Sequence, residues 1–124
     1  MKALMPLLGS ELDTDFLEKV SKLADEIILL LIIDTQDLDK KPFGFVGSEI
    51  MQGNALLADV SNFLKQKNVK TTELTEWGLT LQKIVLASKR EQVNKIIFKS
   101  VENKYFQDLL KALSKETDVE IEAI

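Results

Sequence analysis

The side chains that could carry chemistry in this sequence are mostly carboxylates and lysines, because it contains no cysteine and no histidine. Without cysteine there is no disulfide, no thiol nucleophile and no cysteine-ligated metal. Without histidine, the commonest metal ligand and the commonest general base are also missing. These two absences exclude much of the chemistry that proteins perform.

A group of acidic residues remains as a candidate site. Asp34, Asp37 and Asp39 lie close together in the sequence, and Asp37 and Asp39 could hold a Mg²⁺ ion only if other oxygen ligands converged on them. A solvated run of charges explains them equally well, and carboxylates alone define no reaction. We therefore predict no catalytic residue and no metal site. An enzyme of another α/β family stays open, but a protein that is not an enzyme is the favoured interpretation.

Two short polar stretches could contact an anion. Gly9 and Ser10 precede a predicted helix, where backbone N–H groups can bind an anion, although a helix cap formed by Ser10 or by Asp13 is the commoner role. Lys99 and Ser100 follow a predicted strand. Lys99 could pair with a phosphate, but a solvated lysine at a strand end is the commoner arrangement.

The element that must position these residues is a run of seven apolar side chains at residues 27–33, IILLLII. The run is far shorter than the roughly 20 residues that a membrane helix needs. It does not alternate with polar residues, which indicates that both faces are covered, as in an interior strand of a parallel sheet with helices on either side.

The rest of the sequence alternates between predicted strands and helices. Strands are predicted at residues 3–8, 27–33, 69–74, 93–98 and 119–124, and amphipathic helices at residues 16–24, 56–64, 81–88 and 105–113. Residues 35–47 are predicted to be a loop, because the sequence PFGF at 42–45 interrupts any helical period. The order predicts one domain over residues 1–124: a doubly wound α/β fold with a five-stranded parallel sheet, helices on both faces, and any ligand at the carboxyl ends of the strands.

Composition narrows the possible partners and location. The formal net charge is -4, so the chain lacks the excess of clustered lysine and arginine that marks a nucleic-acid-binding protein. No apolar stretch is long enough to span a membrane, and the apolar stretch at the start of the chain is too short for a signal peptide. We therefore expect a cytoplasmic protein that binds neither nucleic acid nor membrane.

Three stretches resemble the universal stress proteins. Residues 2–10 read KALMPLLGS, similar to that family's first strand, which includes a proline, and to the turn that follows it; residues 26–34 read EIILLLIID, similar to its second strand. Residues 78–100 align without a gap to its helix and strand that begin with glycine and end in Gly-Ser. The resemblance implies the same fold and a homodimer paired through the last strand, or a protein partner. Glu120 and Glu122 work against such pairing, because charges on an edge strand commonly prevent it.

The same comparison shows departures from the members of that family that bind ATP. Leu8 stands where the resemblance implies an acidic residue, and Lys99 stands at the first glycine of the implied phosphate loop. The short stretch from Ser100 to Asn103 contains no glycine, although glycines let backbone N–H groups approach phosphates closely. The resemblance thus favours a protein without a cofactor that acts by self-association or partner docking. The alternative is a divergent ATP-binding protein, or slow ATPase, whose binding residues would be Gly9, Ser10, Ile32, Lys99 and Ser100.

Overall fold

The structure is a computed structural model that describes residues 1–8, 12–34 and 43–124. Strands and helices alternate along it. The strands are β1 (Lys2–Leu7), β2 (Glu26–Asp34), β3 (Lys70–Gly78), β4 (Lys95–Phe98) and β5 (Glu120–Ala123). The described helices are α1 (Thr14–Leu23), α3 (Phe43–Gln66), α4 (Thr80–Arg90) and α5 (Lys104–Glu116).

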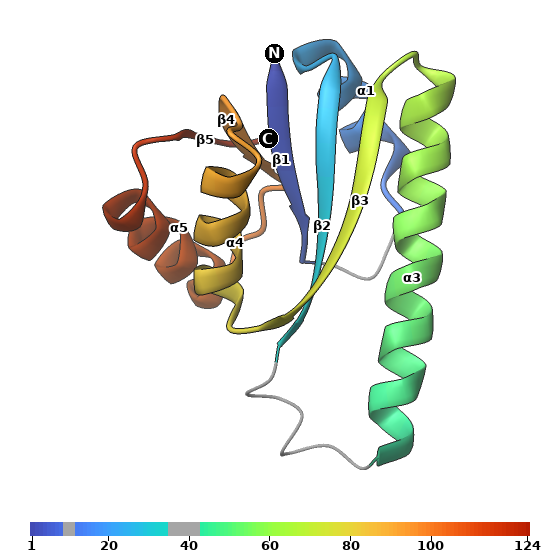
Figure 1. The fold of residues 1–124 in the computed structure, drawn as a ribbon, viewed down its shortest axis with the longest axis vertical. Helices are drawn as coiled ribbons and strands as arrows, with labels where there is room; N and C mark the ends of the chain where they lie inside the picture. The colour runs from blue at the N-terminus through green and yellow to red at the C-terminus, as the bar shows by residue number, and fades with distance from the viewer. Residues whose placement is uncertain (9–11, 35–42) are drawn as a thin grey trace.

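All five strands form one parallel sheet in the order β3-β2-β1-β4-β5. Helices α1 and α3 cover one face and α4 and α5 cover the other (Figure 1). The doubly wound fold predicted from the sequence is confirmed, and β3 lies at one edge of the sheet. Within the described residues, no helix is long and apolar enough to cross a bilayer.

The apolar run in β2 explains why the sheet needs helices on both faces. Because successive side chains of a strand point to opposite faces, the run supplies two cores. Ile27, Leu29, Leu31 and Ile33 pack against α1 and α3, and Ile28 and Leu30 pack against α4 and α5. Leu29 and Leu30 are both 0% exposed, so β2 lies in the interior of the molecule as predicted.

Pro6 lies in an interior strand just beyond the point where its ladder with β4 stops. The N–H of Lys2 donates to Asn94 Oδ1 and its carbonyl accepts from Asn94 N–H, so Lys2 faces β4. Alternate residues face the same neighbour, so the nitrogen of Pro6 also faces β4. The ladder between β1 and β4 ends at the pair Leu4 and Ile96, so the N–H that Pro6 lacks falls beyond the paired region.

Three sequence-based predictions need correction. Helix α3 begins at Phe43, so the loop predicted at residues 35–47 was wrong for its last five positions; proline is tolerated at a helix start, and Pro42 only precedes this one in sequence. Strand β3 continues to Gly78 rather than ending at residue 74, because β2 pairs with it along its full length. The apolar spacing that predicts an amphipathic helix at residues 105–113 places Tyr105 on its buried face, but Tyr105 is 62% exposed.

Candidate functional site

A cavity of about 350 Å³ lies at the carboxyl ends of β1 and β4. At this place the chain reverses direction across the sheet, since β2 and β3 lie on one side of β1 and β4 and β5 on the other. Open α/β sheets bind their ligands at such a switch point. The ladder between β1 and β4 has already ended at Leu4, and Met5, Pro6 and Leu7 border the cavity.

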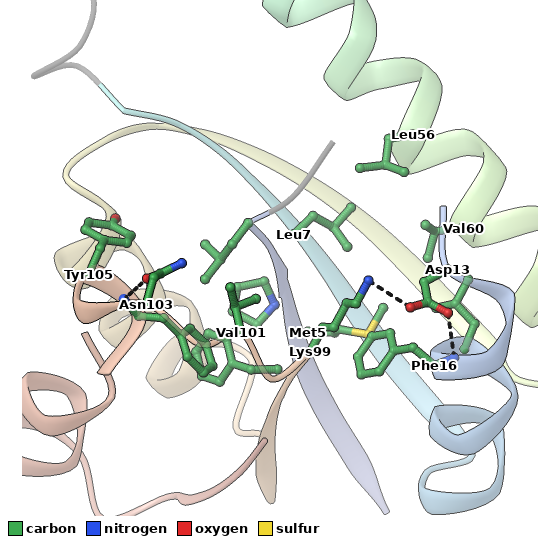
Figure 2. Close-up of a pocket in the computed structure, with 15 residues that line it drawn as sticks. Met5, Leu7, Asp13, Phe16, Leu56, Val60, Lys99, Val101, Asn103 and Tyr105 are labelled. Atoms are coloured by element: carbon green, nitrogen blue, oxygen red, sulfur yellow. Dashed lines mark hydrogen bonds and ion pairs between the residues drawn. The ribbon is translucent and has the colours of Figure 1, made fainter. Parts of the chain in front are cut away.

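The lining of the cavity is mainly apolar and comes from both halves of the chain. Figure 2 shows Leu56 and Val60 of α3, Phe16 of α1 and Met5 of β1 around it. Phe98 and Phe106, whose rings meet edge to face with centroids 5.8 Å apart, complete the side beneath α5. Leu8, Val101 and Tyr105 also line the cavity but are 41%, 44% and 62% exposed.

An ion pair crosses the cavity between the end of β4 and the start of α1. Lys99 Nζ lies 2.7 Å from Asp13 Oδ2, and the other carboxylate oxygen of Asp13 accepts a hydrogen bond of 3.1 Å from the N–H of Phe16 (Figure 2). Asp13 is therefore the N-cap of α1. The hydrogen bond from Lys99, and after it that from Phe16, hold the pKa of Asp13 below its ordinary value.

The start of α5 faces the same cavity and is capped by the side chain of Asn103. Asn103 Oδ1 accepts a 2.7 Å hydrogen bond from the N–H of Phe106. The first turn of a helix offers unpaired N–H groups to an anion, and Asn103 occupies one of them. The N–H of Ser100 is also engaged, because it donates to the carbonyl of Ile124 over 2.9 Å.

The structure places the residues proposed for a nucleotide site in different surroundings. Lys99 lines the cavity, whereas Ile32 is partly buried against the core beneath α4 and α5 and does not belong to the described lining. Ser100 is exposed and bonded to β5 through its backbone. Gly9 and Ser10 lie outside the described residues.

Of the three acidic residues considered as a candidate site, the structure describes only Asp34. Asp34, at the carboxyl end of β2, accepts a 2.8 Å hydrogen bond from the hydroxyl of Thr80 at the start of α4. Asp37 and Asp39 lie outside the described residues. In the part of the chain that is described, no group of three or more acidic, histidine or cysteine side chains is placed to hold a metal ion.

Several lining residues were not recognised as site residues from the sequence. Asp13 was considered only as a helix cap, and Val101 and Asn103 were not considered as cavity residues. The partnership of Asp13 with Lys99 depends on α1 and β4 being brought together across β1, which no local pattern reveals. The useful signal was the expectation that ligands bind at the carboxyl ends of the strands.

Comparison with known proteins identifies the fold. No family model matches the sequence, and no curated protein matches it. The hypothetical protein MJ0577 has a similar structure, with a TM-score of 0.84 and 20% identity over 99% of this chain and 94% of that chain. The universal stress protein UspA from Lactobacillus plantarum gives a TM-score of 0.77 and 12% identity over 99% and 96% of the two chains.

A third structure, a universal stress protein family protein from Arabidopsis thaliana with AMP bound, gives a TM-score of 0.70 and 17% identity over 99% and 90% of the two chains. This chain has the universal stress protein fold. The fold implied by the three resembling stretches is thereby confirmed. Within the universal stress protein fold, this chain builds its switch point from an apolar cavity, an internal ion pair and a capped helix start.

Proposed function

We propose that this chain is a cytoplasmic, single-domain universal stress protein that does not bind ATP and acts in the stress response by self-association or by docking a protein partner. The observation that carries the proposal is that, among the described residues, the chain's own side chains bind Lys99 and the start of α5, two groups at the switch point that could hold phosphates. Asp13 is bound to Lys99, and Asn103 is bound to the first turn of α5.

The ion pair opposes a polyphosphate ligand. A phosphate that contacts Lys99 comes close to the carboxylate of Asp13, which is held in place because its other oxygen caps α1. Two like charges at this separation repel each other, and the pair as it stands presents no net charge to a ligand. A nucleotide would therefore lose part of the attraction that a free lysine supplies.

The connection between β4 and α5 opposes phosphates for a second reason. Every residue from Lys99 to Asn103 carries a side chain, so the backbone cannot approach a phosphate as closely as a glycine-rich loop can. The N–H of Ser100 continues the hydrogen bonding between β4 and β5 instead of pointing to a ligand. Leu8 adds an apolar side chain at the end of β1, where the resemblance implied an acid.

The ion pairs of the last strand weaken one argument against self-association. Glu120 and Glu122, which argued against pairing through β5, both lie within ion-pair distance of Lys95, at 3.7 and 2.8 Å. Their bonds to Lys95, the one to Glu122 above all, raise the pKa of that lysine above its ordinary value. Because Lys95 offsets one of the two charges, the repulsion between two copies of β5 is smaller than the sequence suggests.

The proposal is tested by thermal unfolding with and without nucleotide. A specific ligand at about 1,000 times its Kd stabilises a protein by about 4 kcal/mol, which would raise the Tm of a domain of this size by roughly ten degrees or more. We expect millimolar ATP with Mg²⁺ to give a far smaller shift, and sedimentation at micromolar concentration to show a dimer. A monomer would leave partner docking as the mode of action.

A divergent nucleotide-binding protein with weak ATPase activity is the second candidate. The observation that favours it is the AMP bound to the Arabidopsis thaliana protein of the same fold. In this alternative Lys99 would contact phosphates together with Gly9, Ser10 and Ser100, and the backbone of Ile32 would contact the base. A large shift in Tm with ATP and ADP, but not with inorganic phosphate, that disappears in Lys99→Ala would establish this candidate and overturn the first.

A further inference from the structure

We infer that the cavity at the switch point binds a small, neutral, mainly apolar molecule. The inference rests on the proposed function, since it takes the same cavity to be unsuited to ATP, and it adds the chemical class of the ligand. It is carried by three features of the described residues: the size of the cavity, the balance of charge in its lining, and the exposed apolar side chains at its mouth.

The cavity has the size and composition of a small-molecule site. Its volume of about 350 Å³ falls within the range of roughly 300 to 1,000 Å³ that is typical of ligand pockets, which are lined mostly by apolar and aromatic side chains. Phe16, Phe98 and Phe106 supply aromatic surface, and the side chain of Asn103 supplies a polar group beside it. A flat ring system fits such a lining.

The charge balance selects a neutral ligand. Among the described residues, Asp13 and Lys99 are the charged side chains that line the cavity, and they are bound to each other at 2.7 Å. An anion would be repelled by Asp13 and a cation by Lys99, so an ion of either sign gains less attraction than an unpaired partner would supply. A neutral molecule enters without disturbing the pair.

The mouth of the cavity carries apolar side chains that the fold leaves uncovered. Leu8, Val101 and Tyr105 line the cavity while exposing 41%, 44% and 62% of their surface. Exposed apolar residues that are scattered singly need no explanation, but a group that continues into an apolar cavity marks a binding surface. These side chains would cover the outer edge of a bound ligand and remove it from water.

The test is a fluorescence titration of the whole chain with two matched dyes. N-phenyl-1-naphthylamine is neutral, and 1-anilinonaphthalene-8-sulfonate is the same ring system with a sulfonate added. We expect the neutral dye to bind saturably at one site per chain, and the sulfonate to bind at least about ten times more weakly. Absence of saturable binding by the neutral dye, or equal affinity for the two dyes, overturns the inference.

Variants at the ion pair test the role of charge. Asp13→Asn keeps the cap of α1, because asparagine is as good an N-cap as aspartate, but it leaves Lys99 without its carboxylate. We expect this variant to gain affinity for the sulfonate by about tenfold relative to the neutral dye. If the preference between the dyes is the same as in the unaltered chain, the charge balance does not select the ligand and the inference fails.

Variants at the mouth test the location. Val101→Glu places a charge in the lining and should weaken binding of the neutral dye by about tenfold or more. Leu86→Glu makes the same kind of change on α4 at a residue that is 55% exposed and outside the cavity, and it should leave the affinity unchanged. Equal effects of the two substitutions would overturn the inference.

Competition with ATP separates this inference from the proposed function. If neither dye binds and ATP with Mg²⁺ does not shift the Tm, the inference fails and the proposed function stands. If ATP displaces the neutral dye, both fail, because the cavity then accepts a triphosphate. We expect the neutral dye to bind and millimolar ATP to leave it in place.

Discussion

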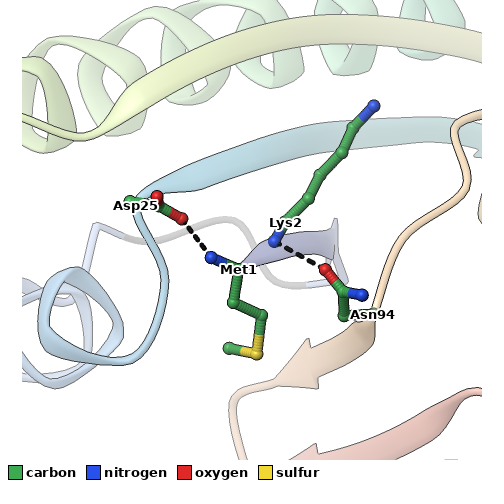
Figure 3. Close-up of polar contacts among 4 residues, drawn as sticks. All are labelled: Met1, Lys2, Asp25 and Asn94. Carbon is green, nitrogen blue, oxygen red and sulfur yellow. Dashed lines mark hydrogen bonds and ion pairs between the residues drawn. The ribbon is translucent and has the colours of Figure 1, made fainter.

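The two ends of β1 differ in how they are joined to β4. At the amino end, the N–H of Lys2 donates to Asn94 Oδ1 and the carbonyl of Lys2 accepts from the N–H of Asn94. Met1 beside it is bound to Asp25, the residue before β2 (Figure 3). At the carboxyl end, β1 keeps its pairing with β2 as far as Leu7 but has none with β4 after Leu4. The amino end of β1 is joined to β4 by hydrogen bonds and has only a wide-open surface hollow beside Met1 and Asp25, whereas the carboxyl end borders the apolar cavity.

The difference shows how a continuous sheet can also hold a site. A parallel ladder satisfies backbone groups wherever it continues, so a cavity between two neighbouring strands requires a place where the ladder stops without leaving buried groups unpaired. Pro6 helps to meet this requirement because it has no N–H to leave unpaired. Within the described residues, no buried side-chain nitrogen or oxygen lacks a partner, so the opening leaves no such group unsatisfied.

The substitution with the largest expected effect on stability lies in the middle of the sheet, between the two ends, where the strands are fully packed. Leu29 is 0% exposed and pairs in register with Met5. We expect Leu29→Asp to abolish folding, because an unpaired buried charge costs several kcal/mol and a domain has only about 5 to 15 kcal/mol of stability. Circular dichroism and thermal unfolding measure the outcome.

A matched control separates burial from the introduction of charge. Leu86→Asp places the same side chain on the exposed face of α4 and should leave a cooperatively folded protein. If Leu29→Asp also melts cooperatively near the temperature of the unaltered chain, β2 is not the centre of the core. The comparison of the two ends of the sheet, which takes the middle of β2 as fully packed, would then be wrong.

The fold could be predicted from the sequence because its signals are local. The apolar run at 27–33 and the amphipathic helices determined the order of elements, and that order limits the topology to few possibilities. The start of α3 was missed because proline and glycine at 42–44 are read as breakers, although a proline is compatible with a helix start. Tyr105 was misplaced because aromatic residues at helical spacing suggest burial, and its tertiary surroundings leave it exposed.

The site was less predictable because its contacts are not local. Lys99 was recognised as a residue at a strand end, but its partner Asp13 belongs to a helix far away in sequence. The cavity depends on where the pairing of β1 with β4 ends. A proline is unusual in an interior strand, and the proline at residue 6 lies just beyond the end of that ladder.

The second prediction compares two asparagines, one at each end of the sheet. Asn94 Oδ1 accepts from Lys2 N–H at 2.9 Å, and Asn103 Oδ1 accepts from Phe106 N–H at 2.7 Å. Substituting either with alanine should lower the free energy of unfolding by about 1 kcal/mol, because a single hydrogen bond and a helix cap contribute similar amounts to stability. Urea unfolding measures both effects.

The two asparagine variants should differ in dye binding, which sharpens the comparison. Asn103→Ala loosens the first turn of α5, which carries Tyr105 and Phe106 into the lining, and should weaken the neutral dye. Asn94→Ala should not alter its affinity, because Asn94 is remote from the cavity. Asn103→Ser keeps a capping side chain and should restore both stability and binding. A loss of dye affinity in Asn94→Ala would show that the two ends are coupled.

The smallest expected effect concerns two carboxylates, again one at each end. The hydrogen bond from Lys99 lowers the pKa of Asp13, and that from the terminal ammonium of Met1 lowers the pKa of Asp25, both below the ordinary value of 3.8. A carboxyl group whose pKa is lower in the folded than in the unfolded state stabilises the fold fully above its unfolded pKa, and this stabilisation is lost as the pH falls through the folded pKa. Both groups are exposed to solvent, so the effects should be smaller than those of the asparagines and should shrink in high salt.

Urea unfolding of the unaltered chain, Asp13→Asn and Asp25→Asn between pH 6 and pH 2 tests the sign. Each variant should be slightly less stable than the unaltered chain at pH 6, and the difference should disappear well below the ordinary pKa of about 3.8, because the unaltered chain then loses the same charge. Since asparagine at 13 keeps the capping hydrogen bond of α1, the deficit of Asp13→Asn measures what the negative charge contributes, through Lys99 first and the start of α1 second. A deficit that persists unchanged at pH 2 would mean that the carboxylate is not held by Lys99, and the charge balance of the cavity would then have to be abandoned.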